Sequence, residues 1–129
     1  MTTPQSEVPV ARRASVLVVE DEVMIRMMVT DMLADLGHSI AGESGEIEEA
    51  LRLAETAEFD LAILDVNVNG RTIEPVAKIV ERRKRPLLFS TGYSVDALPE
   101  NFRSRPALQK PFRIDTLQHA IDAALKAGG

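Results

Sequence analysis

The chain contains no cysteine among its 129 residues, and it contains no long apolar segment. Without cysteine it has no disulfide framework, no zinc site built from thiolates and no thiol nucleophile. No apolar run reaches the length that crosses a membrane, and the N-terminus lacks the apolar core of a secretory signal. These absences favour a cytoplasmic protein that does not bind a membrane.

An excess of positive charge is missing as well. The chain carries 20 acidic against 15 basic residues, a formal net charge of -5, which argues against a nucleic-acid-binding surface. Its length and its hydrophobic content of 45% suit one globular domain with a core of its own. Residues 1–14 show no apolar period, so we predict a flexible tail there and one folded domain over residues 15–127.

Short apolar runs alternate with segments in which apolar residues recur every three or four positions. The first pattern predicts buried strands and the second predicts helices that pack on a core. The predicted strands are 15–19, 38–42, 60–64, 87–91 and 107–110. The predicted helices are 23–36, 44–56, 72–85 and 114–126, with only a short, irregular helix allowed in 93–105. The alternation predicts an α/β protein of (βα)₅ type, a doubly wound, five-stranded parallel sheet with helices on both faces.

Some local features carry further expectations. Asp21 is expected to cap the first helix, and the basic run 82–85 is expected to face the negative dipole end of the third helix. The methionines of the first helix are interpreted as packing groups of the core and of a partner surface. The second strand is predicted to lie at an edge of the sheet and to contribute nothing to a site.

Polar side chains stand where the other strands end, and these ends meet at one edge of a parallel sheet. They are Glu20 and Asp21 after the first strand, Asp65 after the third, Thr91 after the fourth and Lys110 after the fifth. The three carboxylates match the oxygen ligands that Mg²⁺ takes, and the lysine and the hydroxyl could hold a tetrahedral anion. Carboxylates are competent phosphoryl acceptors, so the set predicts an aspartate, Asp65, that receives a phosphoryl group.

Four segments resemble the signatures of response-regulator receiver domains of two-component signalling. They are Val18-Val19-Glu20-Asp21-Glu22, Leu64-Asp65, Ser90-Thr91-Gly92 and Gln109-Lys110-Pro111-Phe112. The run Phe89-Ser90-Thr91-Gly92-Tyr93 resembles a Phe-x-Thr-Gly-Tyr motif of an atypical alphaproteobacterial subfamily that often occurs as single-domain proteins. The resemblance covers nearly the whole chain, and it implies the flavodoxin-like or CheY-like order of strands.

The resemblance also implies a role for each matched residue. Asp65 is the phosphorylated residue, and Mg²⁺ or Mn²⁺ is bound by Asp65, by Asp21, by Glu20 through water and by the main-chain carbonyl of Asn67. Thr91 carries the switch hydroxyl, and Lys110 pairs with the phosphoryl group. The peptide bond between Lys110 and Pro111 is expected to be cis. The donor is a sensor histidine kinase or a histidine phosphotransfer protein that docks near the first helix.

One position departs from the family pattern. Receiver domains carry an aromatic switch residue in the fifth strand, three positions before the lysine, and this chain has Ala107 there. Tyr93 is therefore a candidate substitute for the missing ring, and an equally strong alternative is that Tyr93 merely covers the segment after the fourth strand. We expect conformational change in residues 93–105.

The predicted function is that of a stand-alone receiver, a regulatory phosphoacceptor rather than an enzyme. It acts in a phosphorelay, as a phosphate sink or as a regulator of a partner, without binding DNA, as a monomer or weak dimer. One alternative is a phosphatase of the haloacid-dehalogenase type, which needs a second Asp where this chain has Asn67. The other is a pseudo-receiver that binds partners independently of phosphorylation. Nucleotide binding is the weakest interpretation, because no phosphate-cradling glycine loop follows the first strand.

Overall fold

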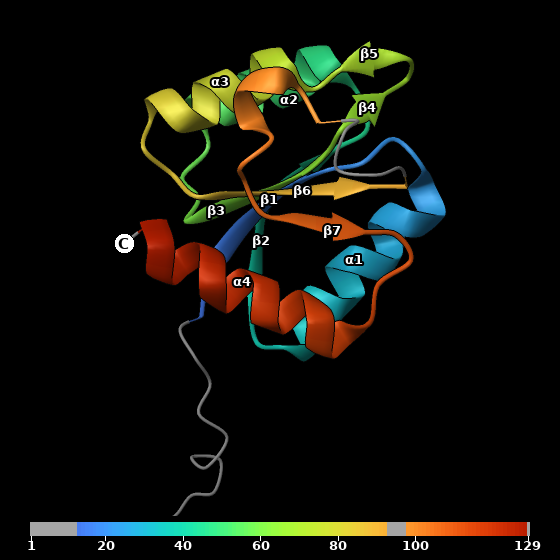
Figure 1. Cartoon of the computed structure of the whole chain (residues 1–129). Helices are drawn as coiled ribbons and strands as arrows, with labels where there is room; N and C mark the ends of the chain where they lie inside the picture. The colour runs from blue at the N-terminus through green and yellow to red at the C-terminus, as the bar shows by residue number, and fades with distance from the viewer. Residues whose placement is uncertain (1–12, 93–97, 129) are drawn as a thin grey trace, which may run out of the picture.

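The computed structural model describes residues 13–92 and 98–128 of the chain (Figure 1). Five parallel strands form one sheet in the order β2-β1-β3-β6-β7. They are β1 (Ser15–Val19), β2 (Ser39–Ser44), β3 (Leu61–Asp65), β6 (Leu87–Thr91) and β7 (Ala107–Gln109). The predicted parallel sheet is confirmed, and so is the place of β2 at its edge.

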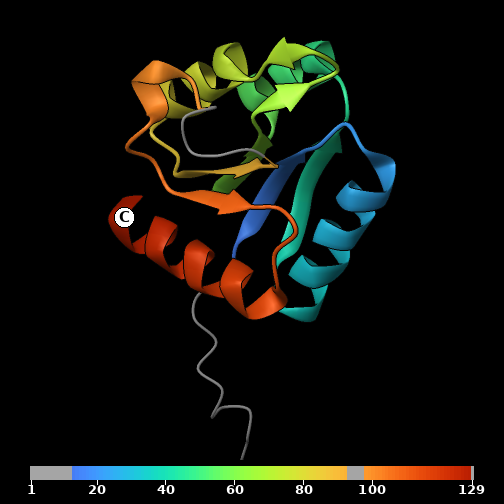
Figure 2. The same cartoon turned by 45° about the vertical axis from the view of Figure 1, so that its right-hand side comes forward.

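Two pairs of helices cover the two faces of the sheet (Figures 1 and 2). One face carries α1 (Val23–Asp35) and α4 (Ile114–Gly128), and the other carries α2 (Ile47–Thr56) and α3 (Glu74–Arg82). Between β6 and β7 the described residues contain only a three-residue 3₁₀ helix, η3 (Glu100–Phe102). None of the helices in the described part of the chain combines the length and the apolar character needed to cross a membrane.

The sheet divides the core into two layers because neighbouring residues of a strand point to opposite faces. In β1, Leu17 and Val19 pack with α2 and α3, whereas Val16 and Val18 pack with α1 and α4. Every residue of β3 is buried, which explains why this central strand is an unbroken apolar run up to Asp65. The core therefore fixes the position at which the carboxylate of Asp65 emerges.

The third predicted helix was wrong at both ends. Residues 72–73 do not begin it, because β4 (Asn67–Val68) and β5 (Arg71–Thr72) pair as a small antiparallel hairpin. It ends at Arg82, and Lys84 takes a left-handed conformation with φ of 61°. The segment after Asp65 is thus a folded hairpin rather than a plain loop.

Other boundaries shift for local reasons. The second helix begins at Ile47, later than predicted, because Ser44 still belongs to β2 and its hydroxyl accepts the N–H of Glu46 at 3.0 Å. Within the basic run, Arg82 stands in the last turn of α3, as expected. Arg83, one residue further on, donates to the carbonyls of Ala54 and Ala57, at 2.5 and 2.9 Å, at the end of α2.

At the end of the sheet opposite the carboxyl ends of the strands, His38 is part of a chain of hydrogen bonds. This buried imidazole accepts the N–H of Ala14 on Nδ1 at 3.0 Å, and its Nε2 lies 3.1 Å from Oε1 of Gln118. Gln118 in turn donates to Asp122 at 2.7 Å. The start of β1, the turn after α1 and helix α4 are joined here. The predicted domain bounds at residues 15 and 127 stay a prediction.

Candidate functional site

The strand ends converge as predicted. A pocket of about 640 Å³ opens at the carboxyl edge of the sheet, and its walls include Asp21, Asp65, Asn67, Thr91 and Lys110. Ile25, Met28 and Pro111 give the pocket an apolar side, and a Cβ atom on Gly92 would have no atom of the described residues within 4 Å. Ala107 does not line the pocket and packs against the core layer between the sheet and helices α2 and α3. Tyr93 falls outside the described residues.

The carboxylates of Glu20, Asp21 and Asp65 form a compact cluster, with one ligand atom of each within 4.8 Å of the others. Glu20 and Asp65 are buried, with 3% and 6% of their surface exposed. Lys110 reaches both of them, since its Nζ lies 3.0 Å from Oε1 of Glu20 and 3.5 Å from Oδ2 of Asp65. One lysine, with 15% of its side chain exposed, therefore pairs with two of the three acids.

Burial and charge act together on the protonation of the cluster. Burial, then the nearby charge of Glu20, raise the pKa of Asp65 to about 7, although Lys110 opposes the shift. Burial alone would lower the pKa of Lys110, but the hydrogen bond from Lys110 to Glu20 and the charge of Asp65 raise it. Lys110 is therefore held as a cation, whereas Asp65 is an unusually basic carboxylate in the absence of a divalent cation.

Asp21 is held from the hairpin side and does not cap α1. Its Oδ2 accepts the main-chain N–H of Asn69 at 2.8 Å, and this bond, acting against burial, contributes to its lowered pKa. The expected capping role was wrong, because the N-cap residue is Glu22 and its N–H donates to Oε2 of Glu20 at 3.0 Å. Asp21 is free of the helix end and directed to the cluster.

The remaining predicted residues surround the aspartate. Thr91 is buried at the end of β6, and its carbonyl accepts the N–H of Lys110 at 2.8 Å. The peptide bond between Lys110 and Pro111 is cis, as the resemblance implied. The side chain of Asn67 accepts the N–H of Gly70 at 2.9 Å, so its oxygen is engaged within the hairpin. Only the main-chain carbonyl of Asn67 is left as its candidate ligand.

Sequence reasoning missed three residues that touch the cluster from outside. They are Arg26 on α1, Gly45 after β2 and Asn69 in the hairpin. The Asn69-Gly70 pair is a turn signal that could have predicted the hairpin, and Asn69 has φ of 54°, as such a turn requires. Arg26 and Gly45 carried no local signal, because their contacts depend on the folded sheet.

The fold and the site match a known family. A family model described as "response regulator receiver domain" matches residues 16–122. The chain is a response regulator receiver domain. The phosphatase alternative is not favoured, in agreement with Asn67 standing where such an enzyme needs a second acid.

Relatives of this receiver domain are both solved structures and longer regulators. The solution structure of SdrG from Sphingomonas melonis Fr1 is 41% identical with a TM-score of 0.79, over 88% of this chain and 97% of SdrG. The PhyR receiver domain of Erythrobacter litoralis is 30% identical with a TM-score of 0.76, over 88% and 91% of the two chains. The transcriptional regulatory protein PdtaR of Mycobacterium tuberculosis is 38% identical over 97% of this chain, which spans 63% of PdtaR.

The donor set of the receiver domain suits a hard divalent cation. Three carboxylates converge in the pocket, and one lysine balances only part of their charge. Oxygen ligands of this kind, with room for water, are what Mg²⁺ takes in proteins, whereas nitrogen or sulfur ligands would favour other metals. The acidic cluster thus fits the magnesium pocket that receiver domains generally have.

Proposed function

We propose that Asp65 accepts a phosphoryl group from a phosphohistidine of a sensor histidine kinase or a histidine phosphotransfer protein. The observation that carries the proposal is the setting of Asp65. It is a buried carboxylate in an open pocket, with two more carboxylates and a lysine on its sides. In the transfer, a carboxylate oxygen of Asp65 forms the new O–P bond while the P–N bond breaks and the histidine ring takes up a proton.

Glu20, Asp21, Asp65 and the main-chain carbonyl of Asn67 are the residues that hold Mg²⁺ or Mn²⁺. A divalent cation bound there supplies charge neutralisation for the carboxylates and for the phosphoryl oxygens. Lys110, which now bridges Glu20 and Asp65, is within reach of a phosphoryl group on Asp65. Thr91, at the end of the neighbouring strand, offers its hydroxyl to the same group.

The donor docks on the side of the pocket formed by α1. This helix exposes Val23, Met24, Met27 and Met28, with Met24 exposed to 80%. Methionine side chains adapt to different apolar surfaces, which suits a contact that forms and dissociates repeatedly. Ile25 and Met28 also line the pocket, so the apolar surface leads directly to Asp65.

The wider function is a signalling protein rather than an enzyme with turnover. We place it in the cytoplasm as a monomeric or weakly dimeric receiver that does not bind DNA. It works in a phosphorelay, as a phosphate sink or as a regulator of a partner. Thr91, Tyr93 and Ala107 stay the candidate positions for the switch, and the Phe-x-Thr-Gly-Tyr motif stays a prediction.

The test is labelling of the purified chain by a phosphorylated phosphotransfer protein or by acetyl phosphate. Label should appear only with Mg²⁺ or Mn²⁺, and Asp65→Asn should abolish it. Asp60→Asn is the matched control, because Asp60 is exposed and bonds the N–H of Ser15 at the far end of β1. Label that persists in Asp65→Asn, or that forms equally well in EDTA, would falsify the proposal.

A further inference from the structure

The segment that follows the edge strand β2 packs directly beneath the acidic cluster. A Cβ atom on Gly45 would lie 2.5 Å from Nη1 of Arg26, 3.3 Å from the carbonyl oxygen of Glu20 and 3.5 Å from Cα of Asp21. Real Cβ atoms essentially never approach another atom within 3.0 Å, so a side chain here displaces the arginine. None of the β2 residues lines the pocket, and the contribution of Gly45, directly after the strand, is a bare backbone.

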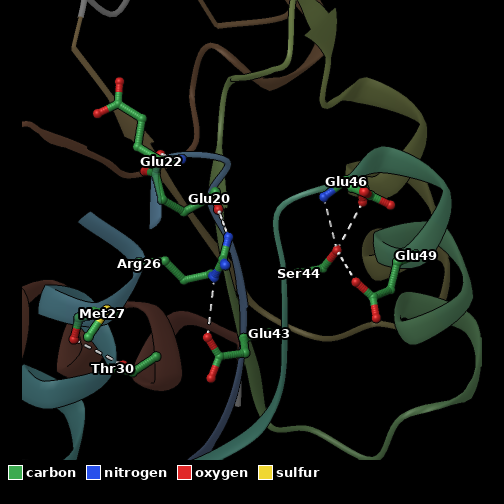
Figure 3. Close-up of polar contacts among 9 residues, drawn as sticks. All are labelled: Glu20, Glu22, Arg26, Met27, Thr30, Glu43, Ser44, Glu46 and Glu49. Carbon is green, nitrogen blue, oxygen red and sulfur yellow. Dashed lines mark hydrogen bonds and ion pairs between the residues drawn. The ribbon is translucent and has the colours of Figure 1, made fainter. Parts of the chain in front are cut away.

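Arg26 ties the turn after β1 to the strand beside it. Its Nη1 donates to the carbonyl of Glu20 at 2.7 Å, and its Nε pairs with Oε1 of Glu43 at 3.3 Å (Figure 3). Only 20% of the arginine side chain is exposed, so the guanidinium is enclosed between these partners. The planar fork of arginine suits two simultaneous contacts in fixed directions.

Asn69 ties the same glycine to the hairpin. Its side-chain Nδ2 donates to the carbonyl of Gly45 at 3.0 Å, while its main-chain N–H donates to Oδ2 of Asp21 at 2.8 Å. Arg26 therefore holds Glu20, and Asn69 holds Asp21. Arg26 and Asn69 both lie next to Gly45. Among the hydrogen bonds recorded for the described residues, none joins Gly45 to a predicted site residue.

We propose that Gly45, Arg26 and Asn69 form a positioning frame that sets the carboxylates of Glu20 and Asp21 for a divalent cation. The three residues are not ligands of the cation or of the phosphoryl group: Arg26 acts through the main-chain carbonyl of Glu20, and Asn69 acts through the carboxylate of Asp21 and the carbonyl of Gly45. This inference rests on the proposed function, because it assumes that the cluster binds Mg²⁺. Groups that orient the ligands of a metal commonly change its affinity by an order of magnitude.

The sign of the effect separates positioning from simple charge. Arg26 is a cation near three carboxylates, so its loss by charge alone would strengthen the binding of Mg²⁺. Its loss as a positioning group releases the turn and weakens the binding. The two roles therefore predict opposite changes in the same dissociation constant.

The experiment is calorimetric titration of the full chain with Mg²⁺ at pH 8, together with urea unfolding in EDTA. The variants are Arg26→Gln, Gly45→Ala and Asn69→Gly, the last of which keeps the left-handed backbone but removes the amide. Arg52→Gln is the control, because Arg52 is exposed and neither Arg52 nor its partner Glu49 lines the pocket. The double variant Arg26→Gln/Gly45→Ala tests whether the two residues act as a unit.

We expect Arg26→Gln and Gly45→Ala each to weaken Mg²⁺ binding about tenfold, Asn69→Gly to weaken it less, and Arg52→Gln to leave it unchanged. The double variant should bind no worse than Gly45→Ala, because the clashing guanidinium is gone. Unchanged or tighter binding in Arg26→Gln and Asn69→Gly, with only the urea stability reduced, overturns the frame. Wild-type protein that binds no Mg²⁺ contradicts the proposed function, and the frame with it.

Discussion

The charges at the carboxyl edge of the sheet and the charges on the layer of α2 and α3 are arranged in opposite ways. At the edge, Glu20, Asp21 and Asp65 form one cluster, and a single lysine pairs with the two buried acids, Glu20 and Asp65. On the helical layer, acids and bases form exposed pairs, such as Glu74 with Lys78 and Glu55 with Arg82. The first arrangement is unbalanced, and the second is matched pair by pair.

The difference indicates what each group of charges is for. Exposed pairs gain little, because water screens them and the side chains must be ordered. The buried cluster costs stability, as the raised pKa of Asp65 records. A fold keeps such a cluster when a ligand completes it, and a divalent cation supplies the missing positive charge. Four measurements test this contrast.

The largest effect is expected from removing the single cation of the cluster. Lys110→Met leaves Glu20 and Asp65 buried without a counter-charge and should lower the free energy of unfolding in EDTA by about 3 kcal/mol at pH 8. Mg²⁺ should restore part of the loss. Urea titrations measure both, with Lys78→Met, whose pair with Glu74 is exposed, as the control. Equal losses in the two variants would refute the contrast.

Removing one acid should act in the opposite direction. With a pKa of about 7 in the folded chain against 3.8 as the reference, ionised Asp65 lowers stability, fully above pH 7 and less as the pH falls toward 4. Asp65→Asn should therefore stabilise the cation-free protein at pH 8 by about 2 kcal/mol, a figure reduced for access of water to the pocket. The gain should shrink at pH 4.5, and a gain independent of pH would count against the buried charge.

Cation binding should compete with protonation of Asp65. Because the cation needs the ionised carboxylate, and the pKa is about 7, the affinity for Mg²⁺ should fall about tenfold between pH 8 and pH 6. Calorimetry in two buffers of different ionisation enthalpy measures both the affinity and the proton released. A flat profile would show that Asp65 is already ionised at pH 6 or takes no part in binding.

The smallest effect belongs to the matched charges. Arg82→Ala removes an exposed pair with Glu55, at 2.9 Å, and should change the free energy of unfolding by less than about 0.5 kcal/mol. Urea unfolding at low and high salt measures it. A loss as large as that of Lys110→Met would mean that the helical layer depends on its ion pairs.

The sequence was sufficient for the sheet and for the residues at the strand ends. β3 is buried throughout, so its apolar run and the position of Asp65 are properties of the strand itself. The ends of parallel strands meet at one edge, and this brings Glu20, Thr91 and Lys110 toward Asp65 without any detailed knowledge of loops. Both inferences use the period and order of the strands, which the chain carries locally.

The sequence was insufficient wherever a contact depends on backbone approach. The value of Gly45 is the absence of a side chain near Arg26, a feature that no periodicity reveals. The surroundings of Ala107 also depend on the folded chain. Ala107 pairs in register with Phe89, and the ring centroids of Phe89 and Phe102 lie 5.7 Å apart. A ring from η3 thus belongs to the same core layer as Ala107, and only the folded chain shows it.

The histidine at the end of the sheet opposite the carboxyl ends of the strands has a consequence for spectroscopy. Since the N–H of Ala14 donates to Nδ1 of His38, the neutral ring must carry its proton on Nε2, directed at Gln118. A single tautomer with a shielded ring proton gives a distinct nitrogen resonance. This imidazole lies at the opposite end of β1 from Glu20 and is therefore a built-in reporter of whether events at the pocket travel the length of the sheet.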